Sequence, residues 1–416
     1  MKMLKTLLLL LSSVFAAVSQ PQFSDDEYTR YELLDPATQS FRILYDVSAT
    51  TPGALFYFNA LRKGSEHKVD EVNDRMTGKK LEWTISSADD ARRTGMIEAE
   101  TGTDYLKIKM TKPVPVGGEN RLRIDKTYKD GTSYFTKDDK IVFDRTLGIN
   151  RNAIVLPAGY EVIKCNYPSQ IILEPDGKLK ISFINTGPQG VPFHLEAKKL
   201  PNPNALVTTK TKTNEVAHAG QGRDKSKARL QFDYPERANQ TREIVYFLQQ
   251  PETHSFRLYH DYTEEKEGID RYINVVRPGS KASNPSAKLL DTGKELKVET
   301  LRGDAISKRG LDIGEPITPE TEVVVIWYDA VQKGQTARLR IEETYTDNNS
   351  YILNENEFIF DRAFGRPFNT VVLPEGWFLT ANAVPATIDL HDGKISLYYI
   401  NSAPEDIDVY IKGKKK

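Results

Sequence analysis

Twice in this chain a phenylalanine is followed directly by an acidic and then a basic residue. The pairs are Asp144-Arg145 and Asp361-Arg362. A carboxylate and a guanidinium together supply directional acceptors and donors, which suits the binding of a sugar or a peptide. Neighbouring residues on a β-strand point to opposite faces, however. The sequence therefore favours separate structural contacts for the two side chains, with ligand binding as the alternative.

The sequence gives little support for nucleophilic catalysis or for metal binding. Cys165 is the single cysteine of the sequence, and with His194 it could in principle form a thiol hydrolase. Cys165 lies in a strand-like apolar run, however, where a lone cysteine usually packs as a small hydrophobic residue. The sequence contains no H-E-x-x-H zinc motif, no G-x-S-x-G elbow and no phosphate loop. We therefore predict no catalytic residue, no metal site and no cofactor.

Aromatic residues are a further source of candidate binding residues. With 20 Tyr and 17 Phe, the chain has enough rings to place some of them on a surface. In the run Phe56-Tyr57-Phe58 the rings must alternate between the two faces of a strand. Tyr57 is therefore a candidate ligand-stacking residue, to be tested by its exposure. Trp327 and Trp377 are expected to pack in the core or at its edge.

These candidates belong to a segment that the chain contains twice. Residues 121–124, with the sequence Arg-Leu-Arg-Ile, recur as residues 338–341 at an offset of 217. Residues 40–42, Ser-Phe-Arg, recur as residues 255–257 at an offset of 215. Solenoid and propeller repeats are roughly 20 to 50 residues long, so a repeat of this length indicates a duplicated domain.

Alternation of apolar and polar residues predicts β-strands along both copies. Residues 106–110 and 179–183 alternate strictly, which is the period of a half-buried strand. The fold class is therefore all-β, a tandem duplication of a β-sandwich-type unit, and a further division of each copy into two β-modules is expected between residues 110 and 121. The offsets place the following pairs in equivalent inward-facing positions: Leu156 and Leu373, Phe143 and Phe360, Ile181 and Leu397, Leu106 and Val323, Ile108 and Val325, and Met110 and Trp327.

The repeat also sets the domain boundaries. Copy one is expected over residues 28–200 and copy two over residues 243–412. Residues 201–240 between them are rich in Lys, Thr, Asn and Gly, which is typical of a linker that proteases cut first. Residues 413–416 contain three lysines and are expected to form a solvated basic tail.

Composition and the first residues limit the partners and the compartment. Lys and Arg number 57 and Asp and Glu 58, so no overall basic field draws the chain to nucleic acid. Residues 1–19 combine two lysines, a short apolar run and small residues before the expected cleavage site, as in a signal peptide. The apolar run is too short for a membrane span. We therefore expect a secreted or periplasmic protein without a membrane span.

The second half of each copy carries the most specific pattern. Residues 143–145 (Phe-Asp-Arg) and 176–178 (Asp-Gly-Lys) recur as residues 360–362 and 392–394. This pattern resembles uncharacterised secreted bacterial proteins with tandem β-domains. More distantly, the succession of charged strands is similar to the β domain that precedes the catalytic domain of gluzincin-type aminopeptidases. This resemblance implies architecture alone, because the zinc motif of those enzymes is missing.

Two functions remain open at this stage. The first is a secreted noncatalytic binding or scaffold protein whose ligand is a protein or a glycan. The duplication, the expected export signal and the lack of a catalytic motif favour it. The alternative is a secreted hydrolase with two carboxylates in the groove between the copies, which requires them to lie within about 10 Å of each other.

Overall fold

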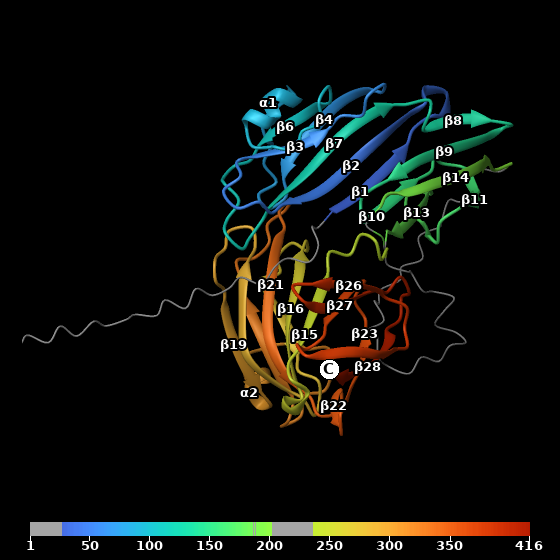
Figure 1. Ribbon diagram of the computed structural model, residues 1–416. Coiled ribbons are helices and arrows are strands. Elements are labelled where there is room, and N and C mark those ends of the chain that lie inside the picture. The colour runs from blue at the N-terminus through green and yellow to red at the C-terminus, as the bar shows by residue number, and fades with distance from the viewer. Residues whose placement is uncertain (1–26, 186, 188, 202–235) are drawn as a thin grey trace, which may run out of the picture.

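The computed structural model describes residues 27–185, 187, 189–201 and 236–416. Nearly all of the regular structure in these residues is β, and it forms two similar halves, copy one in blue to green and copy two in yellow to red (Figure 1). The all-β fold and the tandem duplication are therefore confirmed. The expected signal peptide, residues 1–19, and most of the expected linker lie outside the described residues. No helix in the described part of the chain is both long and apolar enough to span a bilayer.

Copy one contains three sheets. The strands of its seven-stranded sheet follow the order β12 (Gln170–Leu173), β13 (Leu179–Ile184), β10 (Arg151–Val155), β1 (Glu27–Leu33), β2 (Ser40–Ala49), β7 (Asn120–Lys129) and β4 (Glu66–Asp74). The four-stranded sheet has the order β11 (Tyr160–Cys165), β14 (Val191–Lys199), β9 (Lys140–Leu147) and β8 (Tyr134–Lys137). The three-stranded sheet has the order β3 (Phe56–Ala60), β6 (Asp104–Lys109) and β5 (Trp83–Ser87).

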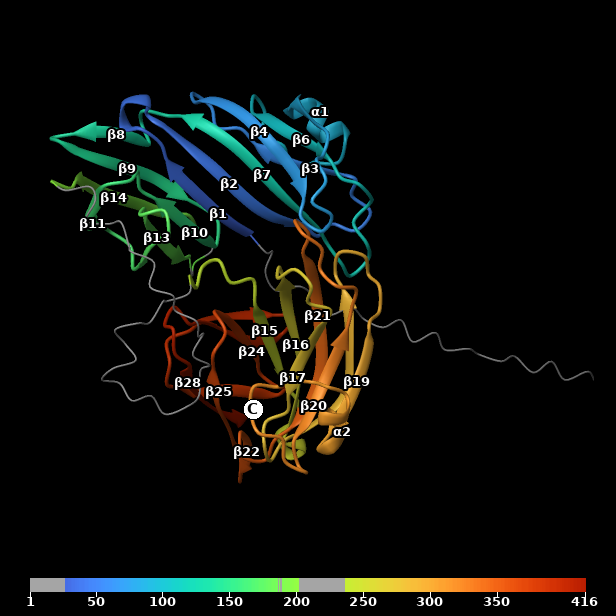
Figure 2. The same cartoon turned by 180° about the vertical axis from the view of Figure 1, so that it is seen from behind.

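Copy two repeats this arrangement. Its seven-stranded sheet has the order β18 (Lys281–Leu289), β21 (Ala337–Thr346), β16 (Ser255–Glu264), β15 (Glu243–Leu248), β24 (Phe368–Val372), β27 (Lys394–Ile400) and β26 (Thr387–His391). The four-stranded sheet has the order β22 (Tyr351–Asn354), β23 (Glu357–Phe364), β28 (Ile407–Lys415) and β25 (Trp377–Asn382). The three-stranded sheet has the order β17 (Arg271–Val275), β20 (Glu322–Trp327) and β19 (Lys297–Arg302). Figure 2 shows the two halves from behind.

The strand order argues against two separate modules within each copy. The long sheet of copy one takes β1, β2 and β4 from before residue 110, and β7, β10, β12 and β13 from after residue 121. β1 pairs in parallel with β10, and β2 pairs with β7. Hydrogen bonds of the sheet therefore cross the expected seam, so each copy folds as one unit.

Aromatic side chains at equivalent positions fill the two main cores. Phe41 and Phe143 meet edge-on with ring centroids 5.6 Å apart, and Phe256 meets Phe360 at the same distance. Packing of this kind adds about 0.5–1.5 kcal/mol per pair to the burial of the rings. Of the six pairs predicted to face inward, three are buried in the main cores, which confirms them: Leu156 with Leu373, Phe143 with Phe360, and Ile181 with Leu397.

The predicted equivalence of Met110 in copy one and Trp327 in copy two is wrong by one residue. Leu106 lies opposite Asn59, and Val324 lies opposite the equivalent Asn274 of copy two. Leu106 and Val324 are therefore equivalent, and the offset here is 218. Side chains alternate along a strand, and the slip therefore turns Val323, Val325 and Trp327 to the opposite face. There they form a second apolar cluster with Ile306 and its neighbours.

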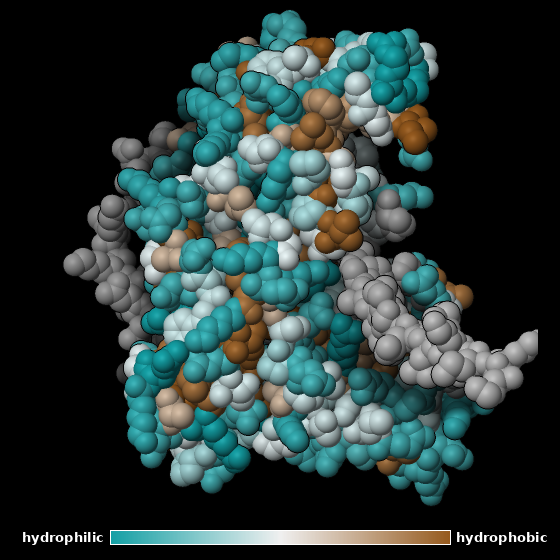
Figure 3. Space-filling model, turned by 90° about the vertical axis from the view of Figure 1, so that its left-hand side faces the viewer, coloured by the Kyte–Doolittle hydropathy of each residue, from teal (hydrophilic) through white to brown (hydrophobic). Residues whose placement is uncertain are grey.

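Two short helices cover that opposite face. Helix α1 (Ala88–Arg93) begins at Ser87, whose hydroxyl accepts a hydrogen bond from the backbone N–H of Asp90. Helix α2 (Asp304–Lys308) holds Ile306 against β20. The face of the molecule that carries β19 and α2 is mostly hydrophilic, with separate small apolar areas (Figure 3).

The expected basic tail belongs to a strand. β28 continues to Lys415 and pairs with β23 and β25 on its two sides. Gly413 lies against the ring of Phe358 and beside the carbonyl of Phe378, so a Cβ at this position would overlap both. Lys414 keeps an exposed side chain. Residues 413–415 are therefore part of the four-stranded sheet of copy two.

Buried ion pairs join the two copies. Arg121 in copy one donates two hydrogen bonds to the carboxylate of Asp291 in copy two, at 2.7 and 2.8 Å, and the side chains are 4% and 2% exposed. Arg338 in copy two lies 3.4 Å from a carboxylate oxygen of Glu119 in copy one. The backbones also approach closely, because a Cβ on Gly118 would lie 2.5 Å from the carbonyl oxygen of Leu290.

Candidate functional site

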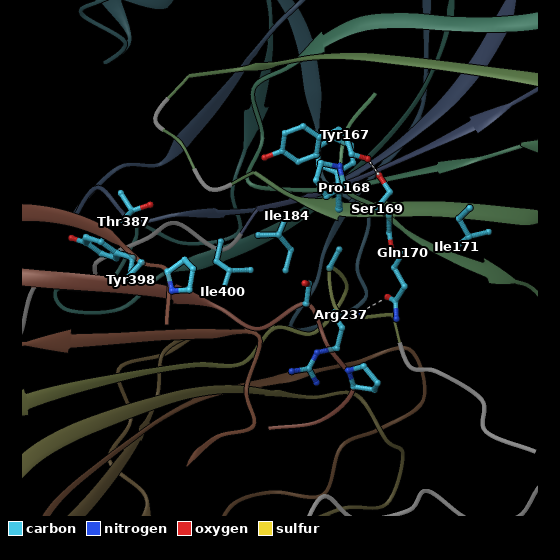
Figure 4. A pocket seen from close by; sticks show the side chains of 17 residues that line it. Tyr167, Pro168, Ser169, Gln170, Ile171, Ile184, Arg237, Thr387, Tyr398 and Ile400 are labelled. Atoms are coloured by element: carbon cyan, nitrogen blue, oxygen red, sulfur yellow. Dashed lines mark hydrogen bonds between the residues drawn. The ribbon is translucent and has the colours of Figure 1, made fainter. Parts of the chain in front are cut away.

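A groove of about 840 Å³ lies between the two copies, at the far ends of the two seven-stranded sheets (Figure 4). One wall comes from the loop before β12 together with β12 and β13. The other wall comes from the loop before β26 together with β26, β27 and the loop after it. The groove is lined by Tyr167, Pro168, Ser169, Gln170, Ile171, Ser182, Phe183, Ile184, Arg237, Ala238, Pro385, Ala386, Thr387, Tyr398, Ile400, Ser402 and Pro404.

The two walls are built from equivalent residues. Pro168 faces the groove from copy one, as Pro385 does from copy two at the offset of 217. Ile184 and Ile400 end the equivalent strands β13 and β27, and Figure 4 shows both of them between the two walls. The groove is therefore a product of the duplication, because each copy contributes the same end of the same sheet.

An apolar cluster closes the floor of the groove. Tyr28, Ala153, Ile184 and Ala238 are buried together, and Phe368 and Ile400 of copy two pack against them. These side chains come from both copies and from the segment that precedes copy two. The burial of their apolar surface stabilises the contact between the copies by roughly 25 cal/mol per Å².

Arg237 fastens the end of the interdomain segment across both copies. Its backbone N–H donates to Oε1 of Gln170 in copy one at 3.1 Å, and its guanidinium donates to the carbonyl oxygens of Gly365 and Asn401 in copy two, at 2.8 and 3.2 Å. Burial lowers the pKa of Arg237. Residues 236–240 were expected in a linker, but the described part of that linker packs between the copies.

One buried hydroxyl faces the groove without a hydrogen-bond partner. Ser182 is 1% exposed, and its Oγ has no partner among the described residues. Neighbouring atoms cover this oxygen, so it lies behind the surface of the groove. Ser182 is therefore a buried polar residue within an otherwise apolar wall.

The groove is almost free of charge. Among the described residues that line it, Arg237 is charged, and neither aspartate nor glutamate occurs. The guanidinium of Arg237 is already bonded to backbone carbonyls. The arrangement therefore suits a neutral ligand, which it can hold by apolar contact and by a few directional hydrogen bonds.

The structure separates the predicted pair Asp144 and Arg145. Arg145 lies inside copy one, where its Nη1 is 3.3 Å from Oδ2 of Asp130 and its guanidinium lies over the ring of Phe41. Asp144 points to the other face and accepts a hydrogen bond from Nδ1 of His194 at 2.9 Å. Neither side chain lines the groove, so each makes its own structural contact.

The second pair behaves in the same way. Arg362 lies 3.2 Å from Asp347 and over the ring of Phe256, so it repeats the contacts of its counterpart in copy one. Asp361 is exposed on the opposite face of β23. The repeated Asp-Arg motif thus marks a buried arginine that supports the core, and Asp361 and Arg362 do not form a joint site.

Tyr57 is half-buried and not an exposed platform. Its ring packs against the main core of copy one, and its hydroxyl lies 3.5 Å from the hydroxyl of Tyr45. The ring therefore lacks the free face that stacking on a sugar requires. Tyr57 lies outside the groove, since the lining residues begin at Tyr167.

Cys165 and His194 make separate contacts. The thiol of Cys165 contacts the carbonyl oxygen of Tyr167 at 3.3 Å, and the ring of His194 is held by Asp144 and Glu196. These carboxylates raise the pKa of His194. The described residues contain no cluster of three or more His, Cys, Asp or Glu side chains that could hold a metal ion.

Two buried ionisable side chains occupy one equivalent position of the two cores. Lys126 donates a hydrogen bond to Oδ1 of Asn59 in copy one, and Asn274 donates one to Oε2 of Glu343 in copy two at 2.8 Å. Burial lowers the pKa of Lys126 to about 8 and raises the pKa of Glu343 to about 7. Both lie in the interior and away from the groove.

The comparisons with known proteins are distant. No family model matches the chain, and no curated protein matches it. Among solved structures it is similar to the M1 zinc metallopeptidase from Deinococcus radiodurans, with 11% identity and a TM-score of 0.28 over 41% of each chain. It is also similar to an aminopeptidase N family protein from Idiomarina loihiensis, with 11% identity and a TM-score of 0.26 over 41% of this chain and 29% of that one.

A collagen adhesin from S. aureus matches over 80% of this chain and 81% of its own, with 8% identity and a TM-score of 0.16. The chain spans less than half the length of the metallopeptidase that it matches. The two peptidase matches accord with the distant architectural resemblance expected from the strand pattern. At these scores the matches assign no family and carry no function.

Proposed function

We propose that the protein is a noncatalytic binding or scaffold protein, and that its ligand, a protein or a glycan, is held in the groove between the two copies. One observation supports this above all others. The groove joins apolar rings and aliphatic side chains with a few hydrogen-bonding groups, and it is built by two copies that buried ion pairs hold together. Concave sites of this composition commonly bind ligands.

We further propose that the protein acts outside the cytoplasm, secreted or periplasmic, as residues 1–19 suggest. The hydrolase alternative requires two carboxylates in the groove, and no described lining residue is an aspartate or a glutamate. Nothing in the groove favours that alternative, and we do not propose it.

An array of glycans and proteins probed with the chain from residue 20 onward tests the proposal. The matched variants are Ala386→Trp, which fills the groove, and Ala330→Trp, which adds the same side chain at an exposed position outside it. We expect Ala386→Trp to reduce binding at least tenfold and Ala330→Trp to leave it unchanged. Equal binding by both folded variants would place the ligand elsewhere.

A further inference from the structure

We propose that Lys126 and Asn59 are a modification site, at which the two side chains condense to an isopeptide bond inside copy one. The bond joins β7 of the seven-stranded sheet to β3 of the three-stranded sheet, so it links the two layers that enclose the core. The proposal is independent of the groove and of its ligand. It assigns a covalent link to a chain that contains one cysteine, Cys165, and therefore has no disulfide of its own.

The first observation is the contact between the two side chains. Nζ of Lys126 donates a hydrogen bond to Oδ1 of Asn59. The amide carbon Cγ is bonded directly to that oxygen, so the amine nitrogen lies within reach of the carbon that it attacks. The nitrogen also lies over the ring of Tyr128, 5.3 Å from its centroid. Among the described residues, no carboxylate forms an ion pair with Lys126, so the amine is not held in a salt bridge.

The second observation is the environment of the amine. Lys126 is 5% exposed and lies on the core-facing side of β7, in line with Ile124 and Tyr128. Ile43 of β2 and Val69 of β4 flank it in the sheet. Burial disfavours the ammonium form and lowers the pKa of Lys126 to about 8, so a neutral amine with a free lone pair is populated near neutral pH. The apolar surroundings also keep competing water away from the amide.

The reaction needs no co-reactant. The lone pair of neutral Nζ forms a bond to Cγ of Asn59, the bond from Cγ to Nδ2 breaks, and one proton passes from Nζ to Nδ2, which leaves as ammonia. A carboxamide reacts slowly with a free amine, but well-oriented groups within one molecule reach effective molarities of about 10⁵–10⁸ M. The product is a neutral amide, so the reaction also removes an ionisable group from the core.

Copy two contains the equivalent site without the nucleophile. Glu343 stands in place of Lys126 at the offset of 217, and Asn274 stands in place of Asn59 at the offset of 215. Asn274 donates from Nδ2 to Oε2 of Glu343 at 2.8 Å, whereas Asn59 turns its carbonyl oxygen toward the amine. Both copies thus place a polar pair at this point of the core, but copy one alone pairs an amine with the amide. Copy two is therefore an internal control in which no bond forms.

Tryptic peptide mapping of the chain from residue 20 onward tests the proposal, after incubation of the folded protein at mildly alkaline pH. The bond blocks cleavage after Lys126. We expect a branched peptide in which residues 43–62 are joined to residues 124–129, lighter than the two separate peptides by one ammonia molecule. The assignment must be made on peptides, because Gln20 at the new N-terminus can also cyclise with loss of ammonia.

The branched peptide should accumulate with incubation time, and denaturing electrophoresis should show it in the monomer, which places the bond within one chain. The peptides that contain Asn274 and Glu343 should remain linear. Recovery of linear peptides alone after prolonged incubation of the folded protein would overturn the proposal and would leave Lys126 and Asn59 as a hydrogen-bonded pair. The proposed ligand binding would be unaffected by that outcome.

Variants assign the two atoms that react. Lys126→Met and Asn59→Val each remove one partner, and the branched peptide should be absent from both. Lys68→Met is the matched control, because Lys68 lies on the neighbouring β4 with an exposed side chain paired to Asp70, and this variant should form the branched peptide like the parent. A branched peptide in folded Lys126→Met or Asn59→Val would overturn the assignment. The map of the parent decides the proposal even if a variant fails to fold, which circular dichroism detects.

Discussion

Arg121 and Arg338 occupy the same position of the two copies, and each of them contacts the other copy. Arg121 donates to both carboxylate oxygens of Asp291 and to the hydroxyl of Thr336, whereas Arg338 lies beside Glu119. Thr336 and Glu119 are themselves equivalent at the offset of 217. The copies are thus joined by exchanged contacts, which fixes the position of one groove wall relative to the other.

Replacing Arg121 should therefore destabilise the whole described structure. Arg121→Met leaves Asp291 buried without its partner, which typically costs about 3–5 kcal/mol. The control is Arg123→Met, because the pair of Arg123 with Asp46 lies within copy one and is partly exposed, so its loss should cost about 1 kcal/mol or less. Urea denaturation measures both. Equal losses would mean that the contact between the copies contributes little to stability.

Cleavage between the copies should not separate them. Residues 202–235 contain several lysines and arginines, and we expect trypsin to cut first near residues 210–227. The ion pairs and the apolar floor of the groove do not include that stretch, so the two protease-resistant halves should remain associated. Size-exclusion chromatography of the nicked protein should show one species that resolves into two only in denaturant. Separate elution under native conditions would contradict this.

The buried Glu343 should make the unfolding free energy fall with rising pH. Its pKa rises from the ordinary 4.5 to about 7 in the fold, so the folded state binds the proton more tightly. This contribution is fully present below pH 4.5 and is lost as the pH rises to 7, for a total of about 3 kcal/mol. Glu343→Gln removes it, so the variant should gain stability relative to the parent between pH 4.5 and 8.

Denaturation at several pH values measures this difference. Glu320→Gln is the control, because Glu320 is exposed in a loop of the same copy. Its difference from the parent should stay constant over the same range. A constant difference for Glu343→Gln as well would show that Glu343 is not desolvated in solution.

Cys165 and His194 should be dispensable for binding. Cys165→Ala and His194→Gln should both retain the ligand affinity of the parent, since neither side chain lines the groove. Cys165→Ala removes a partly buried thiol and should cost about 1–2 kcal/mol of stability through a small cavity. Affinity is measured on samples confirmed folded by circular dichroism. Loss of binding by either folded variant would reopen the thiol-hydrolase hypothesis.

Much of the fold follows from the repeat itself. The offsets identified Phe143 and Phe360 as equivalent core residues because inward-facing positions on a strand tolerate little change in volume or polarity. The predicted equivalence of Met110 and Trp327 failed because the offset rises from 215 at Lys79 to 218 in this strand and returns to 217 at Arg121. Alternation converts the resulting slip of one residue into a change of face. A constant offset cannot detect such an insertion in a stretch where the copies match poorly.

The offsets of the repeat could not predict the groove. Arg237 lies in a stretch whose Lys and Gly content indicates a linker, and its burial depends on carbonyl groups that strands far along the chain supply. Ile171 and Ile388 look like ordinary strand residues, and their exposure depends on where each sheet ends. The repeated Pro168 and Pro385 were the available signal, since they stand at the same place in both walls.

The exchanged arginine contacts resemble those of a symmetric homodimer, in which the same patch of each subunit meets its own copy. In a homodimer the two walls of a central groove must be identical, so a ligand could enter in either direction. Fusion of both copies into one polypeptide removes that constraint. Here one wall carries Gln170 where the other carries Thr387, so the two directions of entry are not equivalent.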